Sequence, residues 1–188
     1  RARGTASLGP LAGKSGWRHD LICEAVGIEM STCYHGSVFS FQLPRHNGKN
    51  DNLAGITVNL PEYRKLVADT AQTASTRYRR RLLETCSMPI GGRYLPPRFW
   101  PELVRCWEEL DRLAAMGTRV VVLYGETALW AVLGKSGVKK NRGHILRTGF
   151  GRDVPGTGLG ELLAVATYHP AASFKQQTAL ALIVEDVQ

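Results

Sequence analysis

The sequence predicts an α/β protein with three layers, α/β/α, around a central, mainly parallel sheet of four strands. Two observations carry this prediction. The continuous apolar runs at 119–124 and 162–167 are typical of strands buried on both faces of a parallel sheet. Segments with helical periodicity alternate with these runs, as they do where helices cover a parallel sheet. With 188 residues, 44% of them hydrophobic, the chain has enough apolar surface for one domain spanning 1–188.

The first half is expected to contain a helix, a strand, a loop and a second helix. The helix over 16–28 ends at Gly27 and places five apolar residues on one face: Trp17, Leu21, Ile22, Ala25 and Val26. The run 33–41, rich in Tyr, Val and Phe, predicts a strand. The polar stretch 45–52 is a loop by composition, and Pro61 opens a helix whose apolar positions continue to Leu82.

The second half is expected to supply the core of the sheet. An amphipathic helix begins at Pro101 and closes at Gly117. The remaining expected elements are a strand at 119–124, a helix at 128–133, a strand at 162–167 and a last helix at 172–187. The segment 135–160 between them is rich in glycine and basic residues, and no internal repeat is present.

The charge of the chain is concentrated in this glycine-rich segment. The chain has 24 Lys and Arg against 16 Asp and Glu, which gives a net charge of +8. This surplus indicates an anionic partner, with nucleic acid first and an acidic membrane surface second, unless it only aids solubility. No acid occurs between Glu126 and Asp153, where the cations are Lys135, Lys139, Lys140, Arg142, Arg147 and Arg152. We predict phosphate binding here, the alternative being a solvated loop.

Two strand ends are candidate ligand sites, because ligands of α/β sheets bind at the carboxyl ends of strands. After the first strand, Gly125-Glu126-Thr127 begins a helix, which favours anion binding. After the second, His169 precedes Pro170, which fixes the turn, so the histidine can project into the cleft.

Other features exclude several classes of protein. No apolar run approaches the ~18 residues of a membrane helix. Four cysteines without a regular framework do not make a disulfide-stapled protein. Since no signal peptide is visible either, we expect a cytoplasmic monomer without a membrane partner.

Several motifs together resemble the uracil-DNA glycosylase superfamily, in particular its thermophilic iron–sulfur branch and the phage relatives of that branch. The C-terminal motifs that carry the resemblance are residues 120–134, Asn141-Arg142-Gly143 and residues 164–172 around Thr-Tyr-His-Pro-Ala-Ala. Residues 91–103 resemble the phage branch, and residues 9–16 resemble the glycine-containing loop of the family. The resemblance covers nearly the whole chain except for 48–90.

The resemblance implies that the protein binds DNA, flips a base out of the stack and hydrolyses its glycosidic bond. His169 would then stabilise the charge that grows on the O2 atom of the base. Phe174 would be the wedge that fills the vacated stack, unless it packs the last helix onto the sheet. The further DNA contacts implied are Lys14, Ser15, Gly125, Glu126, Thr127, Lys139, Lys140, Arg142, Ser173 and Lys175.

The base pocket departs from the pattern of the family. By the resemblance it includes Leu11, Ser37 and Phe39, with Leu11 where the family has a stacking aromatic and Ser37 where it has an asparagine. A serine hydroxyl cannot offer the paired donor and acceptor of an amide. The motif that positions the attacking water would lie before residue 1, so we expect the first strand to be missing from this sequence. No Cys-x-x-Cys pair occurs, and we expect neither an iron–sulfur cluster nor another cofactor.

Three functions therefore compete at this level. The first is a DNA glycosylase that excises uracil or a modified pyrimidine, which the presence of His169 favours. The second is a DNA-binding or partner-binding descendant without catalysis, which the altered pocket favours. The third is a phage enzyme that modifies a flipped base.

Overall fold

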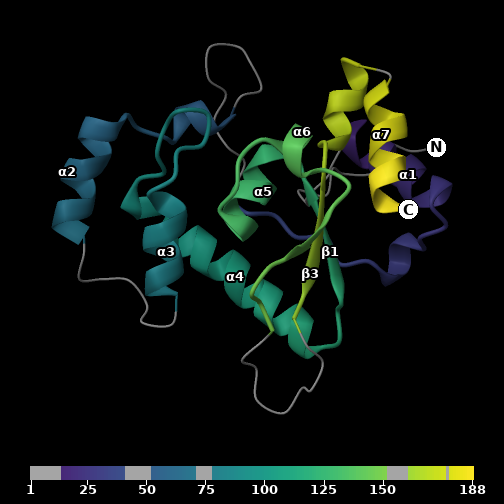
Figure 1. Ribbon diagram of the computed structural model, residues 1–188, viewed down its shortest axis with the longest axis horizontal. Coiled ribbons are helices and arrows are strands. Elements are labelled where there is room, and N and C mark those ends of the chain that lie inside the picture. The colour runs from purple at the N-terminus through teal and green to yellow at the C-terminus, as the bar shows by residue number, and fades with distance from the viewer. Residues whose placement is uncertain (1–13, 41–51, 71–77, 152–160, 177) are drawn as a thin grey trace, which may run out of the picture.

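The computed structural model describes residues 14–40, 52–70, 78–151, 161–176 and 178–188, and Figure 1 shows how their elements are arranged. The described helices of eight or more residues are α1 (Lys14–Ala25), α2 (Leu60–Thr70), α3 (Arg79–Cys86), α4 (Trp100–Ala115), α5 (Gly125–Leu133) and α7 (Thr178–Val187). The strands are β1 (Val120–Tyr124), β2 (Ile145–Arg147) and β3 (Leu163–Thr167). Shorter helical turns are η1 (Met30–Thr32), η2 (Asn52–Gly55), η3 (Pro97–Phe99), α6 (Val138–Asn141) and η4 (Pro170–Phe174).

The sheet has three strands in the described residues, in the order β1-β3-β2. β1 and β3 are parallel, with Val120 opposite Leu163 and Tyr124 opposite Thr167. β2 is antiparallel to β3. The predicted α/β class agrees with this mixture of helices and sheet, but the four-stranded, mainly parallel sheet does not appear in the described part of the chain.

The prediction of a strand over 33–41 is wrong for its described residues, 33–40, which form bends and irregular chain. Side chains of α4 explain why this segment needs no sheet neighbour. The Arg105 guanidinium donates to the carbonyls of Ser37 at 2.7 Å and Val38 at 3.2 Å. The Glu102 carboxylate accepts from the Ser40 amide at 2.8 Å. These bonds satisfy backbone groups that a sheet ladder would otherwise satisfy.

Helix α1 agrees in position with the predicted first helix, but its faces differ from the expectation. It buries His19, Ile22 and Cys23, whereas Trp17, expected on the apolar face, is 56% exposed. The chain leaves the helix through Gly27, whose φ of +70° is the left-handed conformation that glycine adopts without strain.

Two other predicted helices are divided in the structure. The helix expected from Pro61 to Leu82 is observed as α2 and α3, and residues 71–77 between them lie outside the described residues. The helix expected over 172–187 is observed as η4 and then α7. In η4 the buried Ser173 hydroxyl donates to the Pro170 carbonyl at 2.7 Å, which holds the chain in a tight turn after the strand end.

One core joins the helices of the middle of the chain to the sheet. Its largest members include Trp107 of α4, Trp130 of α5 and Leu82 of α3, and it extends to Leu123 and Ala164 of the strands. The two buried indoles donate to carbonyls of Ala131 and Met88 respectively, so their polar atoms are satisfied. In Figure 1, α3 and α5 lie to the left of the strands and α1 and α7 to the right, while α4 runs from α3 toward the lower end of the strands. No helix in the described ranges is both long enough and apolar enough to cross a membrane.

Candidate functional site

The candidate site lies where β1 and β3 end. Because these strands are parallel and Tyr124 is opposite Thr167, the next residues of both strands meet at one edge of the sheet. Helix α5 begins there at Gly125, and η4 begins after His169. The sequence analysis named each of these strand ends as a candidate ligand site, and the parallel register places the two ends side by side.

Gly125 and His169 lie so close together that only glycine fits without adjustment. Gly125 has a φ of +83°, and a Cβ built on it would lie 3.1 Å from the Cβ of His169. Both the backbone conformation and the approach therefore require a residue without a side chain. The beginning of α5 thus lies directly against the histidine.

The His169 ring is oriented by a local hydrogen bond. Its Nδ1 accepts from the Ala171 amide at 3.1 Å. An imidazole nitrogen that accepts must carry a lone pair, so the neutral ring carries its proton on Nε2. Desolvation lowers the pKa of His169 below its ordinary value, which favours the neutral ring. The neutral ring therefore offers its Nε2–H as a hydrogen-bond donor.

A cluster of rings lies beside this edge and was not singled out from the sequence. The buried His19 contacts His35 and Tyr124 edge to face, with ring centroids 5.0 and 5.3 Å apart. Burial, followed by the charge of His35, lowers the pKa of His19. Burial also raises the pKa of the Tyr124 hydroxyl. The cluster anchors α1 and the 33–40 segment at the end of β1 through edge-to-face ring contacts.

The predicted base-pocket residues fall in different environments. Leu11 lies outside the described residues. Phe39 is buried in the main core, so the structure does not present its ring to a base. Ser37 is exposed, and its carbonyl accepts from Arg105.

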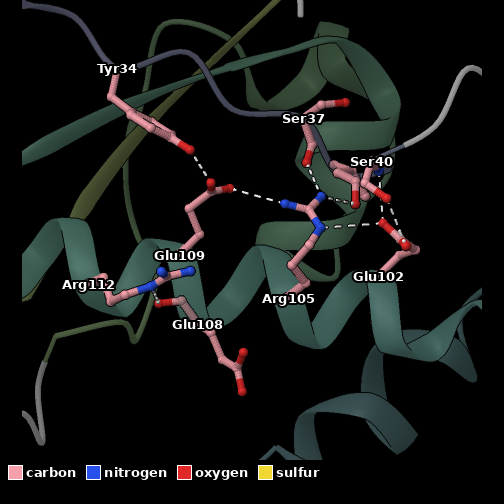
Figure 2. Close-up of polar contacts among 9 residues, drawn as sticks. Tyr34, Ser37, Ser40, Glu102, Arg105, Glu108, Glu109 and Arg112 are labelled. Carbon is pink, nitrogen blue, oxygen red and sulfur yellow. Dashed lines mark hydrogen bonds and ion pairs between the residues drawn. The ribbon is translucent and has the colours of Figure 1, made fainter. Parts of the chain in front are cut away.

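The segment carrying Ser37 is fastened to α4 by a polar network, which Figure 2 shows. Arg105 contacts Glu102 and Glu109, each at 3.4 Å, besides the two carbonyls of the segment. The Tyr34 hydroxyl donates to Glu109. The Ser40 hydroxyl donates to Glu102 at 3.0 Å. We call these contacts the α4 clamp; they fix the position of the predicted pocket wall.

The predicted phosphate contacts at the beginning of α1 and on α6 are accessible. Lys14 is exposed and Ser15 half-buried in the first turn of α1, while Lys139 and Lys140 are exposed on α6. Thr127 is half-buried in the first turn of α5. Their contacts with DNA stay predictions.

Glu126 and Arg142 have partners within the chain. The Glu126 carboxylate accepts from the amides of Gly137 at 2.7 Å and Val138 at 3.1 Å, and so positions α6. The Arg142 guanidinium lies 2.7 Å from Asp186 and 3.3 Å from Glu185 of α7. The acid-free interval in the sequence is therefore not free of acids in space, and a phosphate would compete with these carboxylates for Arg142.

The three predicted contacts after His169 differ in accessibility. Ser173 is buried, so the structure does not present it to DNA. Phe174 is 44% exposed and Lys175 is exposed. Phe174 is therefore not buried against the sheet, which was the alternative to its role as a wedge.

The four cysteines are free. Cys23, Cys86 and Cys106 are buried, each in a different helix, and burial raises the pKa of the Cys106 thiol to about 11. Within the described part of the chain, no group of three or more His, Cys, Asp or Glu residues is placed to hold a metal ion.

The fold and the site together describe an α/β protein that carries a histidine at the carboxyl end of a pair of parallel strands. In comparisons with known proteins, the chain matches no family model and no curated protein.

Proposed function

We propose that this chain is a DNA glycosylase-like protein that flips uracil or a modified pyrimidine out of DNA and hydrolyses its glycosidic bond. The observation that supports this most is the Nε2–H donor of His169, fixed by the bond from the Ala171 amide to Nδ1. The net charge of +8 and the exposed Lys14, Lys139 and Lys140 suit a polyanionic partner.

The reaction needs such a donor. Water adds to the sugar C1′ and gives up a proton to solvent, while the bond from C1′ to N1 of the base breaks. The bonding electrons leave with the base, whose negative charge is shared with O2, and the base then takes a proton. A neutral Nε2–H aimed at O2 stabilises this charge as it develops. The products are a free pyrimidine and an abasic site.

A second candidate is a DNA-binding descendant without excision activity. One observation favours it: Phe39, a predicted residue of the base pocket, is buried in the core. In this case the scaffold would bind nucleic acid without recognising a flipped pyrimidine.

An assay for abasic sites separates the two candidates. The protein is incubated with single- and double-stranded oligonucleotides containing uracil or 5-substituted uracils, and abasic sites are revealed by alkaline cleavage. The first proposal predicts cleavage at one or more of these bases. The cleavage should be slowed about 10²–10³-fold in His169→Ala and kept in His144→Ala, which changes an exposed histidine on the same half of the chain. Salt-sensitive binding without cleavage of any substrate would establish the second candidate instead.

A further inference from the structure

We propose that Trp17, Arg18 and Phe174 form a stacking platform that binds unpaired bases and gives the protein a preference for single-stranded DNA. This inference rests on the proposed function in taking DNA as the partner. Unlike the wedge role expected for Phe174 alone, it joins α1 to η4 in one surface.

The geometry of the platform is a cation between two aromatic rings. The guanidinium carbon of Arg18 lies 4.9 Å from the centroid of the Trp17 ring and 5.1 Å from that of Phe174. Both distances are within the range of cation–π contacts. The helix α1 packs against η4, so two segments far apart in the sequence share this surface. In Figure 1, α1 and α7 lie together at one end of the molecule.

Both rings are exposed although they are large and apolar. Trp17 is 56% exposed and Phe174 is 44% exposed. A helix in a globular protein ordinarily turns such residues toward the core. Since Arg18 contacts one side of each ring, we assign the other side to a ligand.

No carboxylate among the described residues pairs with Arg18. Its buried Nε has no hydrogen-bond partner in that part of the chain either. Arg142, by comparison, contacts two carboxylates. A guanidinium held only by ring faces keeps its positive charge for a partner from outside.

Two further cations extend this surface. Lys14 precedes Arg18 by one helical turn, and Lys175 directly follows Phe174; both are exposed. The nearest acid along α1, Asp20, is two residues from Arg18 and therefore about 200° around the helix. Rings for stacking together with cations for the backbone are the combination that single-stranded nucleic acids require.

The preference for single strands follows from the availability of base faces. In a duplex the faces of the bases are covered by their neighbours, whereas an unpaired base can stack on a side-chain ring. Within the platform, Phe174 follows His169 by five residues in the sequence. A strand stacked on Phe174 would therefore place a neighbouring nucleotide toward the candidate site.

Tryptophan fluorescence tests the proposal directly. Of the four tryptophans, Trp100, Trp107 and Trp130 are buried, so quenching by a bound base reports on Trp17. The probe is a short oligothymidylate, which contains no uracil, titrated alone and as a duplex with its complement. We expect quenching by the single strand, and an affinity about tenfold higher than for the duplex.

Variants assign the effect to the platform, with binding followed by the anisotropy of labelled oligothymidylate. Trp17→Ala and Phe174→Ala should each weaken single-strand binding about tenfold. Trp17→Phe should keep the affinity and lose the quenching. Arg18→Ala should weaken binding and lower its salt dependence. The matched control is Arg98→Ala, which removes another arginine that lies 4.9 Å from a neighbouring ring, that of Phe99, and should leave binding unchanged.

Several results would overturn the platform: no quenching when the single strand binds, equal quenching by the duplex, or wild-type affinity of folded Trp17→Ala. Circular dichroism establishes that each variant is folded. The excision assay fails or succeeds independently, because oligothymidylate binding needs no excision. Quenching without excision would support the platform and remove the proposed function, and excision without quenching would do the reverse.

Discussion

Two half-buried arginines, Arg105 and Arg18, differ in the groups that their guanidinium ions contact. Arg105 contacts Glu102 and Glu109 and donates to two backbone carbonyls. Arg18 contacts two aromatic rings, and its Nε has no hydrogen-bond partner among the residues that the structure describes. The charge of Arg105 is paired with carboxylates of the chain. We propose that the charge of Arg18 is available to a ligand instead.

The difference gives a way to distinguish a structural residue from a candidate ligand-binding residue, namely whether its polar groups are already bound within the chain. Ser37 and Arg105 belong to the α4 clamp, whose polar atoms are bound to one another, so this region fixes the position of the 33–40 segment. The edge at Gly125 and His169 offers a hydrogen-bond donor. The platform at Trp17 offers exposed rings and a cation that no described carboxylate pairs with. We therefore propose this second region as the place of ligand binding and of the reaction.

The largest effect is expected from removing the donor at the strand edge. His169→Ala should lower the rate of base excision about 10²–10³-fold, because one charge-stabilising donor is worth that much in catalysis. Binding of oligothymidylate should stay close to wild type. If His144→Ala slowed excision equally in the same abasic-site assay, the role assigned to His169 would be wrong.

The close approach at Gly125 gives the next largest effect. Gly125→Ala should lower the free energy of unfolding by about 1–2 kcal/mol, because a Cβ is strained at a φ of +83°. It should also slow excision, since the new Cβ would lie 3.1 Å from that of His169. Urea unfolding and the abasic-site assay measure the two effects.

Gly137→Ala is the control for this substitution. Gly137 has the same φ of +83°, but a Cβ there would meet only the Lys140 side chain, at 3.8 Å. It should lose similar stability and keep the excision rate. Equal rates in the two variants would show that the packing of Gly125 on His169 does not matter for the reaction.

The two arginines should differ in what their removal changes. Arg105→Met should lower the free energy of unfolding by about 1–2 kcal/mol, since the carbonyls of Ser37 and Val38 lose this donor and two carboxylates each lose one of their partners. Arg18→Met should change it by about 0.5 kcal/mol and instead weaken single-strand binding. Urea unfolding measures the stability of both variants, and anisotropy measures their binding of single strands. If Arg18→Met lost more stability and Arg105→Met lost more binding, the distinction between the two regions would be wrong.

The smallest effect is a dependence of stability on pH. The pKa values of His19 and His169 are lowered in the folded protein from an ordinary value of 6.5, so the unfolded chain binds more protons just below that pH. Their contribution to the free energy of unfolding is therefore full above about pH 6.5 and falls as the pH drops through it, until the folded protein also takes up these protons.

Urea unfolding between about pH 8 and pH 5 measures this dependence. His19→Phe keeps a ring beside His35 and Tyr124 and should show a smaller loss toward acid than wild type. His144→Ala should keep the wild-type dependence. An unchanged pH dependence in His19→Phe would show that burial of His19 does not oppose its protonation.

The part of the fold that could be predicted is the part set by local pattern. Long apolar runs located β1 and β3, and regular spacing of large apolar residues located α4, whose predicted face is the buried one. Their parallel pairing then placed Gly125 beside His169. The short strand β2, only three residues long, has too few positions for a periodic signal.

Long-range contacts account for what could not be predicted. The strand expected over 33–41 has suitable residues, but α4 side chains 62 to 68 positions away satisfy its backbone groups. Arg142 stands in an acid-free interval, yet its carboxylates come from α7 at the end of the chain. Trp17 fits the apolar face of its helix, and only the packing of α1 against η4 shows that it is exposed beside Arg18 and Phe174.

The central claim, that the edge at His169 excises a base, is tested most directly by the intact mass of a uracil-containing single strand after incubation with the protein. Excision predicts that the strand loses the mass of one uracil molecule and gains that of one water, and that His169→Ala leaves most of the strand unchanged in the same time. An unaltered mass for every uracil and 5-substituted uracil, or a mass change that retains the base, would contradict the account.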